Sequence, residues 1–412
     1  MRRAALVLAI LASSGARADG AFPTGMSVLL PANAPQRVLV GTTFGLVMSE
    51  DSGATFRYVC EPYITGSGVT VIIYQAGSDG GIVAAHQDAL SQSSDLGCSW
   101  TRASGAPAGQ LVIDAFIDPS NPSSVLAIAS STASSSLLLS TDGGRSFGAT
   151  LLTSGTAPVP AGELLVSVEI AASAPAPGVY YATSFAFPSA SSPGGSAALL
   201  RSGDGGASWT RFPLAVGPLV QVKIAQVDPA DAKTVYLRVS TGSTDEIRVT
   251  TDGGATIQPP LLAPGTSLGG FVRASDGTLY AGTGGGDFYV RAPGAPSFDR
   301  LPGPHLLCLG ERAGRIYACG TSAIDGYDLA TSVDRGHSFQ KLLSFTQILG
   351  PATCPAVQSA CAADFEQLQR TLVGAPGVGN CSCGLPAGDA SALLILLAAL
   401  RRRRRAPAPD RR

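Results

Sequence analysis

Residues 49–56, Ser-Glu-Asp-Ser-Gly-Ala-Thr-Phe, form a stretch that the chain repeats, and this repetition decides the fold. The shared pattern, Ser/Thr-x-Asp-x-Gly-x-Ser/Thr-aromatic, is referred to below as the box. The first residues of successive copies are 44, 47, 62, 48, 41 and 41 residues apart. A period of about 40 to 50 residues is typical of propeller blades. The copies occupy residues 49–56, 93–100, 140–147, 202–209, 250–257, 291–298 and 332–339.

Each residue type in the box suits a turn between two strands. The Asp carboxylate can accept hydrogen bonds from backbone N–H groups ahead of it, and the Gly two residues later can adopt positive φ. The aromatic residue opens the next strand and packs in the core. The copy at 250–257 lacks the aromatic residue, and the copy at 291–298 lacks the Asp and the Gly. We therefore expect structural roles for Asp51, Asp95, Asp142, Asp204, Asp252 and Asp334.

The box resembles the Asp-box (BNR) repeat, and the resemblance covers nearly all of residues 26–345. It implies that each box joins the third and fourth strands of a blade. Polar turns such as 118–122 and 228–231 lie between the boxes and precede short apolar runs, which predicts a hairpin in every repeat. Together these features predict an all-β, seven-bladed β-propeller of four-stranded antiparallel blades over residues 19–350, followed by a short disulfide-stapled helical segment over 351–379.

The two ends of the chain have the character of targeting segments. Residues 1–18 combine Arg2-Arg3, an apolar run and a small-residue cleavage site, which predicts a secretory signal peptide. Residues 380–412 contain Cys381 and Cys383, an apolar run from 390 to 400 and the arginines 401–405. This end resembles the MYXO-CTERM sorting tail, which implies cleavage by a sorting protease with Cys381 or Cys383 as the modified residue. A simple membrane anchor is the alternative.

Charge narrows the choice of partners. Removal of the signal peptide and of the tail after Cys383 leaves 18 basic and 27 acidic residues, a net charge of about −9. An acidic body argues against nucleic acid and anionic lipid as partners. We expect contact with a membrane only through the unprocessed tail, and a monomer at the cell surface (outer membrane) or outside the cell.

Eight cysteines in an exported chain favour disulfides. Cys308 and Cys319 flank the turn at 313–314 and are predicted to pair across a hairpin. Cys354 and Cys361 bracket a short loop and are predicted to pair there, before a helix expected over 362–373. Cys60 and Cys98 remain; they could pair with each other, although the predicted fold places one at a strand end and the other in the box turn of the next blade. Since the chain has three His and no paired Cys-x-x-Cys, no metal site and no cofactor are expected.

A catalytic alternative comes from the glycoside hydrolases that share the box. A sialidase would need three arginines around the substrate carboxylate, a Tyr–Glu nucleophile pair and an acid/base Asp. The first predicted strand carries no Arg, and Arg211-Phe212-Pro213 is a weak match in the wrong blade. Arg273, Arg291, Arg312 and Arg315 need not converge. A hydrolase with paired carboxylates from separate blades stays open as the second hypothesis.

A binding role is the first hypothesis. The boxes and the polar hairpin turns share one face, so the loops between the second and third strands and the crossings between blades form the opposite face. That face is the usual recognition surface of propellers, and exposed aromatic side chains there can anchor a glycan or a protein. The candidate binding residues are Phe44, Tyr63, His86, Phe185, Phe187, Asp245, Glu246, Asp287 and Asp325. Phe185 and Phe187 have the alternative of covering the edge of their own blade.

We therefore predict an exported, surface-located propeller without a cofactor. It binds a polysaccharide or a protein partner, or serves as a scaffold. A glycoside hydrolase is the alternative from another class, and an assembly factor like the photosystem-assembly propellers is the third. Such assembly factors use a basic Arg patch, and the acidic body counts against this option.

Overall fold

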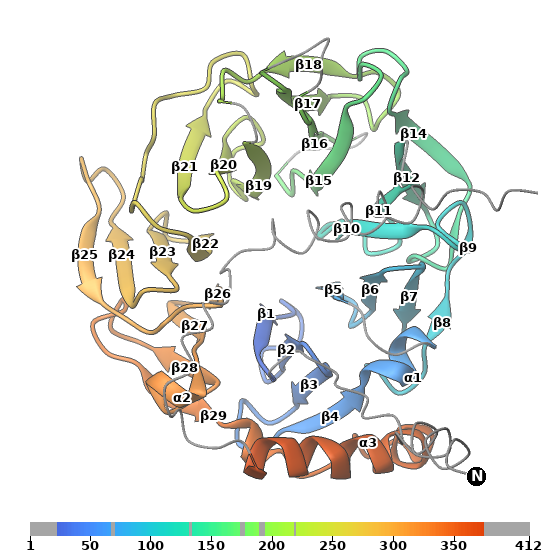
Figure 1. Cartoon of the computed structure of the whole chain (residues 1–412), viewed down its shortest axis with the longest axis vertical. Coiled ribbons are helices and arrows are strands. Elements are labelled where there is room, and N and C mark those ends of the chain that lie inside the picture. Colours follow the sequence, from blue (N-terminus) through green and yellow to red (C-terminus); the bar gives the residue numbers. More distant parts are fainter. Residues whose placement is uncertain are drawn as a thin grey trace, which may run out of the picture.

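The computed structural model describes residues 23–66, 71–131, 134–173, 178–188, 194–217 and 220–374. These residues form a ring of seven blades around a central axis, and the chain passes through the blades in sequence order (Figure 1). The predicted seven-bladed all-β propeller is therefore confirmed. The predicted signal peptide and the predicted sorting tail, with Cys381 and Cys383, lie outside the described residues.

Each blade is one continuous segment whose strands run in chain order from the axis to the rim (Figure 1). Blades 1 to 3 contain β1 (Gly25–Leu29), β2 (Val38–Thr42), β3 (Gly45–Ser49) and β4 (Arg57–Cys60); β5 (Ile73–Ala76), β6 (Ile82–His86), β7 (Ala89–Ser93) and β8 (Thr101–Arg102); β10 (Leu111–Ile117), β11 (Val125–Ser130), β12 (Ser135–Ser140) and β14 (Ala149–Thr153). Blades 4 and 5 contain β15 (Leu164–Ile170), β16 (Tyr180–Ala186), β17 (Ser196–Ser202) and β18 (Thr210–Pro213); β19 (Gln221–Val227), β20 (Val235–Ser240) and β21 (Asp245–Thr250). Blades 6 and 7 contain β22 (Leu268–Arg273), β23 (Leu279–Thr283), β24 (Asp287–Arg291) and β25 (Asp299–Pro302); β26 (Cys308–Arg312), β27 (Arg315–Cys319), β28 (Leu329–Ser332) and β29 (Gln340–Leu343).

Short elements lie between or beside the blades. The outer strands of blades 2 and 3 are linked at the rim by a parallel pair, β9 (Ser104–Gly105) and β13 (Ser146–Phe147). The helices α1 (Glu61–Thr65) and α2 (Ser322–Asp325) lie in a crossing and a loop, and η1 (Phe345–Gln347) and α3 (Pro355–Gly374) follow blade 7.

Blade 5 differs from the predicted pattern, because it has three named strands where the other blades have four. The segment at 258–262 runs along the edge of β21 with one isolated bridge, between Ile247 and Leu262. Pro259 and Pro260 lie in this segment and have no N–H group to donate. A regular fourth strand therefore does not form after the box that lacks its aromatic residue.

The second strands of the blades are buried on both faces, since each blade packs between two neighbours. Every residue of β2, β6 and β11 is buried. Val-, Ile-, Leu- and Ala-rich runs of this kind are expected when both faces of a strand are covered. The inner strands that line the axis are only partly buried, which leaves room there for polar side chains.

The box turns have one repeated hydrogen-bond pattern. In blade 1 the Asp51 Oδ1 atom accepts from the Ser49 hydroxyl and from the Thr55 N–H, both at 2.8 Å, and the Gly53 N–H donates to Ser49 Oγ at 2.8 Å. In the third and fourth boxes, hydrogen bonds of this kind lower the pKa of the Asp carboxyl to about 2. The largest effect comes from the hydroxyl of the Ser that lies four residues after the Asp. These carboxylates are saturated by local donors, so the geometry fits the structural role expected for them.

The box glycine is needed for packing as well as for its backbone conformation. The residue before this glycine also has positive φ, yet three of the boxes have Ser52, Leu96 or Arg335 at that position. Positive φ alone therefore does not explain why the box residue is glycine. A Cβ on the glycine would meet the preceding blade instead: it would lie 2.3 Å from Phe288 at Gly336 and 2.6 Å from Leu342 at Gly53. The glycine therefore allows neighbouring blades to approach each other closely.

Polar side chains accept hydrogen bonds from backbone N–H groups of the innermost strands in part of the ring. Asp114 accepts the N–H of Val168 in the next blade at 2.9 Å, and Glu169 accepts that of Val227 at 2.9 Å. Gln226 does the same for the Arg273 N–H at 2.7 Å. These bonds cap backbone donors that an edge strand would otherwise leave open. Burial raises the pKa of Glu169 to about 8, with a smaller contribution from the nearby Asp114, so Glu169 is neutral at pH 7.

Replacement of Glu169 by Gln is expected to stabilise the protein at alkaline pH. The folded pKa of about 8 lies above the ordinary value of 4.5, so the favourable contribution of the neutral acid is complete below pH 4.5 and is lost as the pH rises through 8. Gln keeps the acceptor and never ionises, as Gln226 shows in the next blade. We expect Glu169→Gln to raise the free energy of unfolding at pH 8 by roughly 1 to 3 kcal/mol.

Urea unfolding at pH 5 to 9 measures this effect. Gln226→Glu is the mirror control, because it places an ionisable group in the same kind of site and should add a loss of stability at high pH. Parallel pH profiles for Glu169→Gln and the wild-type protein would contradict an un-ionised Glu169.

The ring is closed by the segment after blade 7 and not by an exchanged strand. Residues 349–352 run parallel to β4: the Leu349 N–H donates to the Phe56 carbonyl at 3.0 Å, and the Ala352 N–H donates to the Tyr58 carbonyl at 2.9 Å. The helix α3 then packs along the outer edge of blade 1 (Figure 1). Two disulfides fix it there, Cys60–Cys361 and Cys98–Cys354, each with a Cα–Cα distance of 5.5 Å.

These disulfides correct the predicted Cys354–Cys361 pair. The helix begins at Pro355 and not near 362, since Pro is well suited to the first helical position. Seven residues of helix separate the two cysteines by about 10 Å, too far for one bond between them. Both face the propeller and pair with Cys60 and Cys98. The hairpin disulfide is present as predicted, with Cys308 directly opposite Cys319 and a Cα–Cα distance of 4.8 Å.

Candidate binding face

The strand order places two kinds of loop on opposite faces of the ring. Box turns and the hairpin turns between first and second strands share one side, the box face. The loops between second and third strands, and the crossings between blades, share the other side, which is referred to below as the loop face. The predicted binding residues lie on or just below the loop face, on four kinds of support: strand ends, short loops, α1 and α2.

Phe44 and Tyr63 serve mainly to hold the ring closure. The Phe44 ring is 5.0 Å from that of Phe345 and 5.8 Å from that of Tyr58, between centroids. The Tyr63 hydroxyl donates to the Cys98 carbonyl at 3.0 Å. Both side chains are partly buried against the core cluster that includes the closing segment. Their aromatic surface is thus largely used within the protein.

Phe185 and Phe187 pack against each other in an edge-to-face arrangement, with 4.8 Å between ring centroids. Phe185 is buried, whereas Phe187 keeps part of its ring exposed. Both belong to the core cluster of blades 4 and 5, with Leu214 and Val216 of the following crossing. Phe187 is therefore the half of this pair that remains open to a partner.

His86 is fully buried, and both of its ring nitrogens are bonded. Nδ1 lies 2.9 Å from Asp88 Oδ1, and Nε2 lies 2.9 Å from the Ser91 hydroxyl. Burial lowers the pKa of His86, and Asp88 only partly opposes this, so the ring is neutral. The order Asp–His–Ser matches that of a catalytic triad, but the Ser91 side chain is also buried. The array stabilises the hairpin of β6 and β7 and has no access to a substrate.

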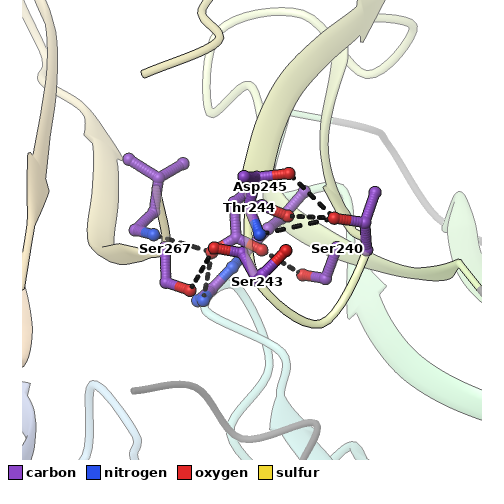
Figure 2. A network of polar contacts seen from close by, with 8 residues as sticks. Ser240, Ser243, Thr244, Asp245 and Ser267 are labelled. Carbon is purple, nitrogen blue, oxygen red and sulfur yellow. Dashed lines mark hydrogen bonds and ion pairs between the residues drawn. The ribbon is translucent and has the colours of Figure 1, made fainter. Parts of the chain in front are cut away.

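Asp245 is buried in a polar network at the loop-face end of blade 5 (Figure 2). Its Oδ2 atom accepts from Arg238 Nη2 and from the Leu268 N–H, both at 2.7 Å, while Oδ1 accepts from the Ser240 hydroxyl. The Leu268 bond ties blade 5 to blade 6. Asp245 therefore acts as a link between blades. In the outer part of the network the Ser267 hydroxyl donates to the Ser243 carbonyl at 3.5 Å, and the Thr244 hydroxyl lies 2.8 Å from that of Thr241.

A second buried ion pair lies in blade 4 and was not among the predicted site residues. Glu163 is buried and accepts the Ser184 hydroxyl at 2.8 Å, the Ser196 hydroxyl at 2.6 Å and the Arg211 guanidinium. Arg211, the weak sialidase match, is thereby used inside the blade. No local sequence pattern connects these residues, because they come from a crossing and three strands.

Asp287 and Asp325 lie at the loop-face ends of the neighbouring blades 6 and 7. Asp287 pairs with Arg300, whose Nη2 atom lies 2.7 Å from Oδ1. Asp325 lies 3.0 Å from His305 Nδ1 and also accepts the Thr321 N–H at 2.7 Å. Residues 284–287, 300–307 and 320–327 are referred to below as the blade 6–7 seam. His305 and Arg300 were not predicted as site residues.

Most of the charged groups of the loop face are paired. Asp88 pairs with Arg102 at 2.6 Å and Glu246 pairs with Arg248 at 2.9 Å, in addition to the pairs described above. Asp328 has no such short pair but is buried, and burial raises its pKa to about 6 while it accepts the Phe345 N–H. The loop face therefore offers balanced charges and many hydroxyl groups, without a block of one sign.

The late arginines do not converge into a clamp in the described part of the chain. Arg273 pairs with Asp228 at 2.9 Å, Arg291 donates to the Ala295 carbonyl at 2.8 Å, and Arg312 donates to the Arg37 carbonyl at 2.8 Å. Among the described residues, no group of three or more His, Cys, Asp or Glu side chains is arranged to hold a metal ion. No helix within the described ranges is long and apolar enough to cross a membrane.

Comparison with known proteins shows similarity in fold to solved propeller structures. No protein-family model matches this chain, and no curated protein matches its sequence. The solved propeller of Dos1 aligns with a TM-score of 0.52 at 10% identity, over 80% of this chain and 86% of that one. PorZ, a surface component of the type-IX secretion system of Porphyromonas gingivalis, aligns with a TM-score of 0.50 at 12% identity, over 78% of this chain and 38% of PorZ. YCF48 from Cyanidioschyzon merolae aligns with a TM-score of 0.47 at 15% identity, over 72% and 92%.

Proposed function

We propose that this propeller is an exported, non-catalytic binding or scaffold module whose loop face recognises a polysaccharide or a protein at the cell surface. The observation that carries the proposal is the pairing of the loop-face carboxylates. Asp88, Glu163, Asp245, Glu246, Asp287 and Asp325 each contact an Arg or a His. These contacts hold the carboxylates in fixed positions, and the partly exposed ones, Asp88, Glu246 and Asp287, can take part in recognition by hydrogen bonds.

The same pairing weighs against the hydrolase alternative. A glycosidase needs one carboxyl group with a raised pKa as the acid, and a second, free carboxylate some 5 to 10 Å away across a cleft. Asp328 has a raised pKa, but it is buried and bonded to the closing segment. Glu169 also has a raised pKa, but its carboxyl caps the Val227 N–H in the inner wall of the ring.

Export is supported by the cysteines. The described residues hold the disulfides Cys60–Cys361, Cys98–Cys354 and Cys308–Cys319. Disulfides persist in oxidising compartments and are rare in the cytosol. We therefore propose the predicted signal peptide and sorting tail as the route by which the protein reaches the cell surface.

A panel of polysaccharides and sialosides tests this function. The secreted protein is incubated with each compound, and both retention of the protein and release of soluble product are recorded. We expect retention without product. Product release that disappears when a loop-face carboxylate is replaced would show a hydrolase instead. A protein retained by no glycan but captured by one surface protein would keep the binding role and select the protein partner.

A further inference from the structure

Only one histidine of the described chain is both oriented and accessible. His86 is buried with both nitrogens bonded, and His337 is exposed on the box face. His305 differs from both, because its side chain is 33% exposed and is held by Asp325. An imidazole fixed through one nitrogen, with the other nitrogen facing outward, is a common arrangement in ligand and catalytic sites.

Asp325 is well placed to fix the tautomer of His305. Its side chain is only 8% exposed and accepts the Thr321 N–H at 2.7 Å, the His305 backbone N–H at 3.2 Å and His305 Nδ1 at 3.0 Å. A carboxylate can only accept, so Nδ1 carries the proton. With the proton on Nδ1, the Nε2 atom is available to accept a hydrogen bond.

The Asp287–Arg300 pair includes the first residue of the strand that begins next to Gly286, the glycine that approaches this histidine. Arg300 donates through Nε at 2.8 Å and Nη2 at 2.7 Å to the same Oδ1 atom of Asp287, which leaves Oδ2 and the remaining guanidinium hydrogens for a partner. The Arg300 side chain is 67% exposed. Gly286, the residue before Asp287, lies against the His305 ring: a Cβ on it would be 3.7 Å from Nε2. Glycines at 284–286 keep side chains away from the approach.

The chemistry of these groups selects a class of ligand. The seam combines an acceptor nitrogen, a carboxylate oxygen and a guanidinium donor, which matches hydroxyl groups that donate and accept at once. Asp287 and Asp325 disfavour an anion, and Arg300 disfavours a cation. Ile324 is the exposed large hydrophobic residue of the seam and offers an apolar edge, much less than the buried anchors typical of protein partners.

We propose that the blade 6–7 seam is a glycan-binding site that takes a vicinal diol of a neutral polysaccharide. His305, Asp287 and Arg300 contact the sugar, and Asp325 is a positioning residue for His305. The proposal rests on the binding function proposed above and names the ligand class for that face.

Affinity gel electrophoresis of the secreted protein tests the site. The gels contain a β-glucan, a xylan or a galactomannan as neutral probes, and polygalacturonate as the anionic probe. We expect at least one neutral polysaccharide to retard the wild-type protein, and polygalacturonate to leave it unretarded. Arg300→Ala and His305→Ala should each weaken binding by at least about tenfold. Arg335→Ala breaks an exposed pair with Asp276 on the opposite, box face and should bind like the wild type.

Asp325→Asn tests the positioning role separately. We expect the imidazole ¹⁵N shifts of His305 to show the Nδ1–H tautomer in the wild type and a mixture in the variant, with weaker binding. Thermal unfolding checks that each variant is folded.

The outcomes separate the two proposals. Wild-type retention that survives Arg300→Ala and His305→Ala, or that Arg335→Ala weakens equally, overturns the seam and leaves the binding function standing. Retention by polygalacturonate alone also overturns the proposal that the ligand is a neutral polysaccharide. A protein that no polysaccharide retards overturns the glycan site, and a surface protein captured by it would then carry the binding function.

Discussion

Replacing Cys60 and Cys361 together by Ala is expected to lower the free energy of unfolding by about 3 to 5 kcal/mol. This disulfide joins residues 301 positions apart and fixes α3 on blade 1. A cross-link that closes so long a loop restricts the unfolded chain strongly, and it also holds the segment that closes the ring. Guanidinium unfolding under non-reducing conditions, followed by tryptophan fluorescence and circular dichroism, measures the change.

The hairpin disulfide is the matched control for this result. Cys308 and Cys319 are 11 residues apart within one blade, so their replacement by Ala should cost less, about 2 to 3 kcal/mol. An equal or larger loss for the hairpin pair would contradict the account of ring closure. A loss below about 1 kcal/mol for Cys60 and Cys361 would contradict it as well.

Gly336→Ala is expected to destabilise the protein by about 2 to 5 kcal/mol. Gly336 has φ of 88°, where an L-residue is strained, and its new Cβ would lie 2.3 Å from Phe288 Cε1. Phe288 is fully buried against Phe339, with 5.2 Å between ring centroids, so it has little room to move. The blades 6 and 7 would have to separate locally to admit the methyl group.

Gly143→Ala measures the backbone part of that effect alone, so the difference between the two variants gives the packing part. Gly143 also has positive φ, 76°, but a Cβ there would meet nothing within 4 Å. Its position in the box is held by Ser52, Leu96 and Arg335 in other blades. We expect a loss below about 2 kcal/mol, from the backbone alone. Thermal and denaturant unfolding of both variants gives the comparison, and similar losses would show that close packing of the box glycine is unimportant.

The sequence predicts the ring well because the box is a local motif. The bonds of Asp51 and Ser49 that close the turn all lie within four residues, and the spacing of such turns gives the number of blades. Blade 5 shows the limit of this reasoning. The box at 250–257 is present, but Pro259 and Pro260 remove the N–H groups that a regular fourth strand needs.

The cysteine pairs depend on where one helix begins. Spacing alone suggests a loop between Cys354 and Cys361. Cys354, Cys361 and Leu368 follow one another at intervals of seven residues. A helix that starts at Pro355 therefore places them on one face. That heptad spacing was the available signal. The partners Cys60 and Cys98 lie more than 250 residues away, and only the closed ring brings them near.

The sequence indicates which face of the ring the candidate binding residues lie on, but it does not indicate which of their side chains are buried. Asp245 and His86 lie near the loop face as expected, yet both are buried and bonded within their blades. Sequence position gives the end of a strand, but the exposure of a side chain depends on the neighbouring blade. His305 and Asp325 are 20 residues apart on different loops, so their contact has no local signature.

Hydrogen exchange with and without bound ligand tests the central claim, recognition through the loop face, most directly. The ligand is surface polysaccharide extracted from the producing cells, and the protein is the secreted form. The account predicts protection of loop-face segments, above all 284–287, 303–307 and 320–327, while the box turns exchange unchanged. Protection confined to the box turns, or release of soluble sugar during the incubation, would contradict it.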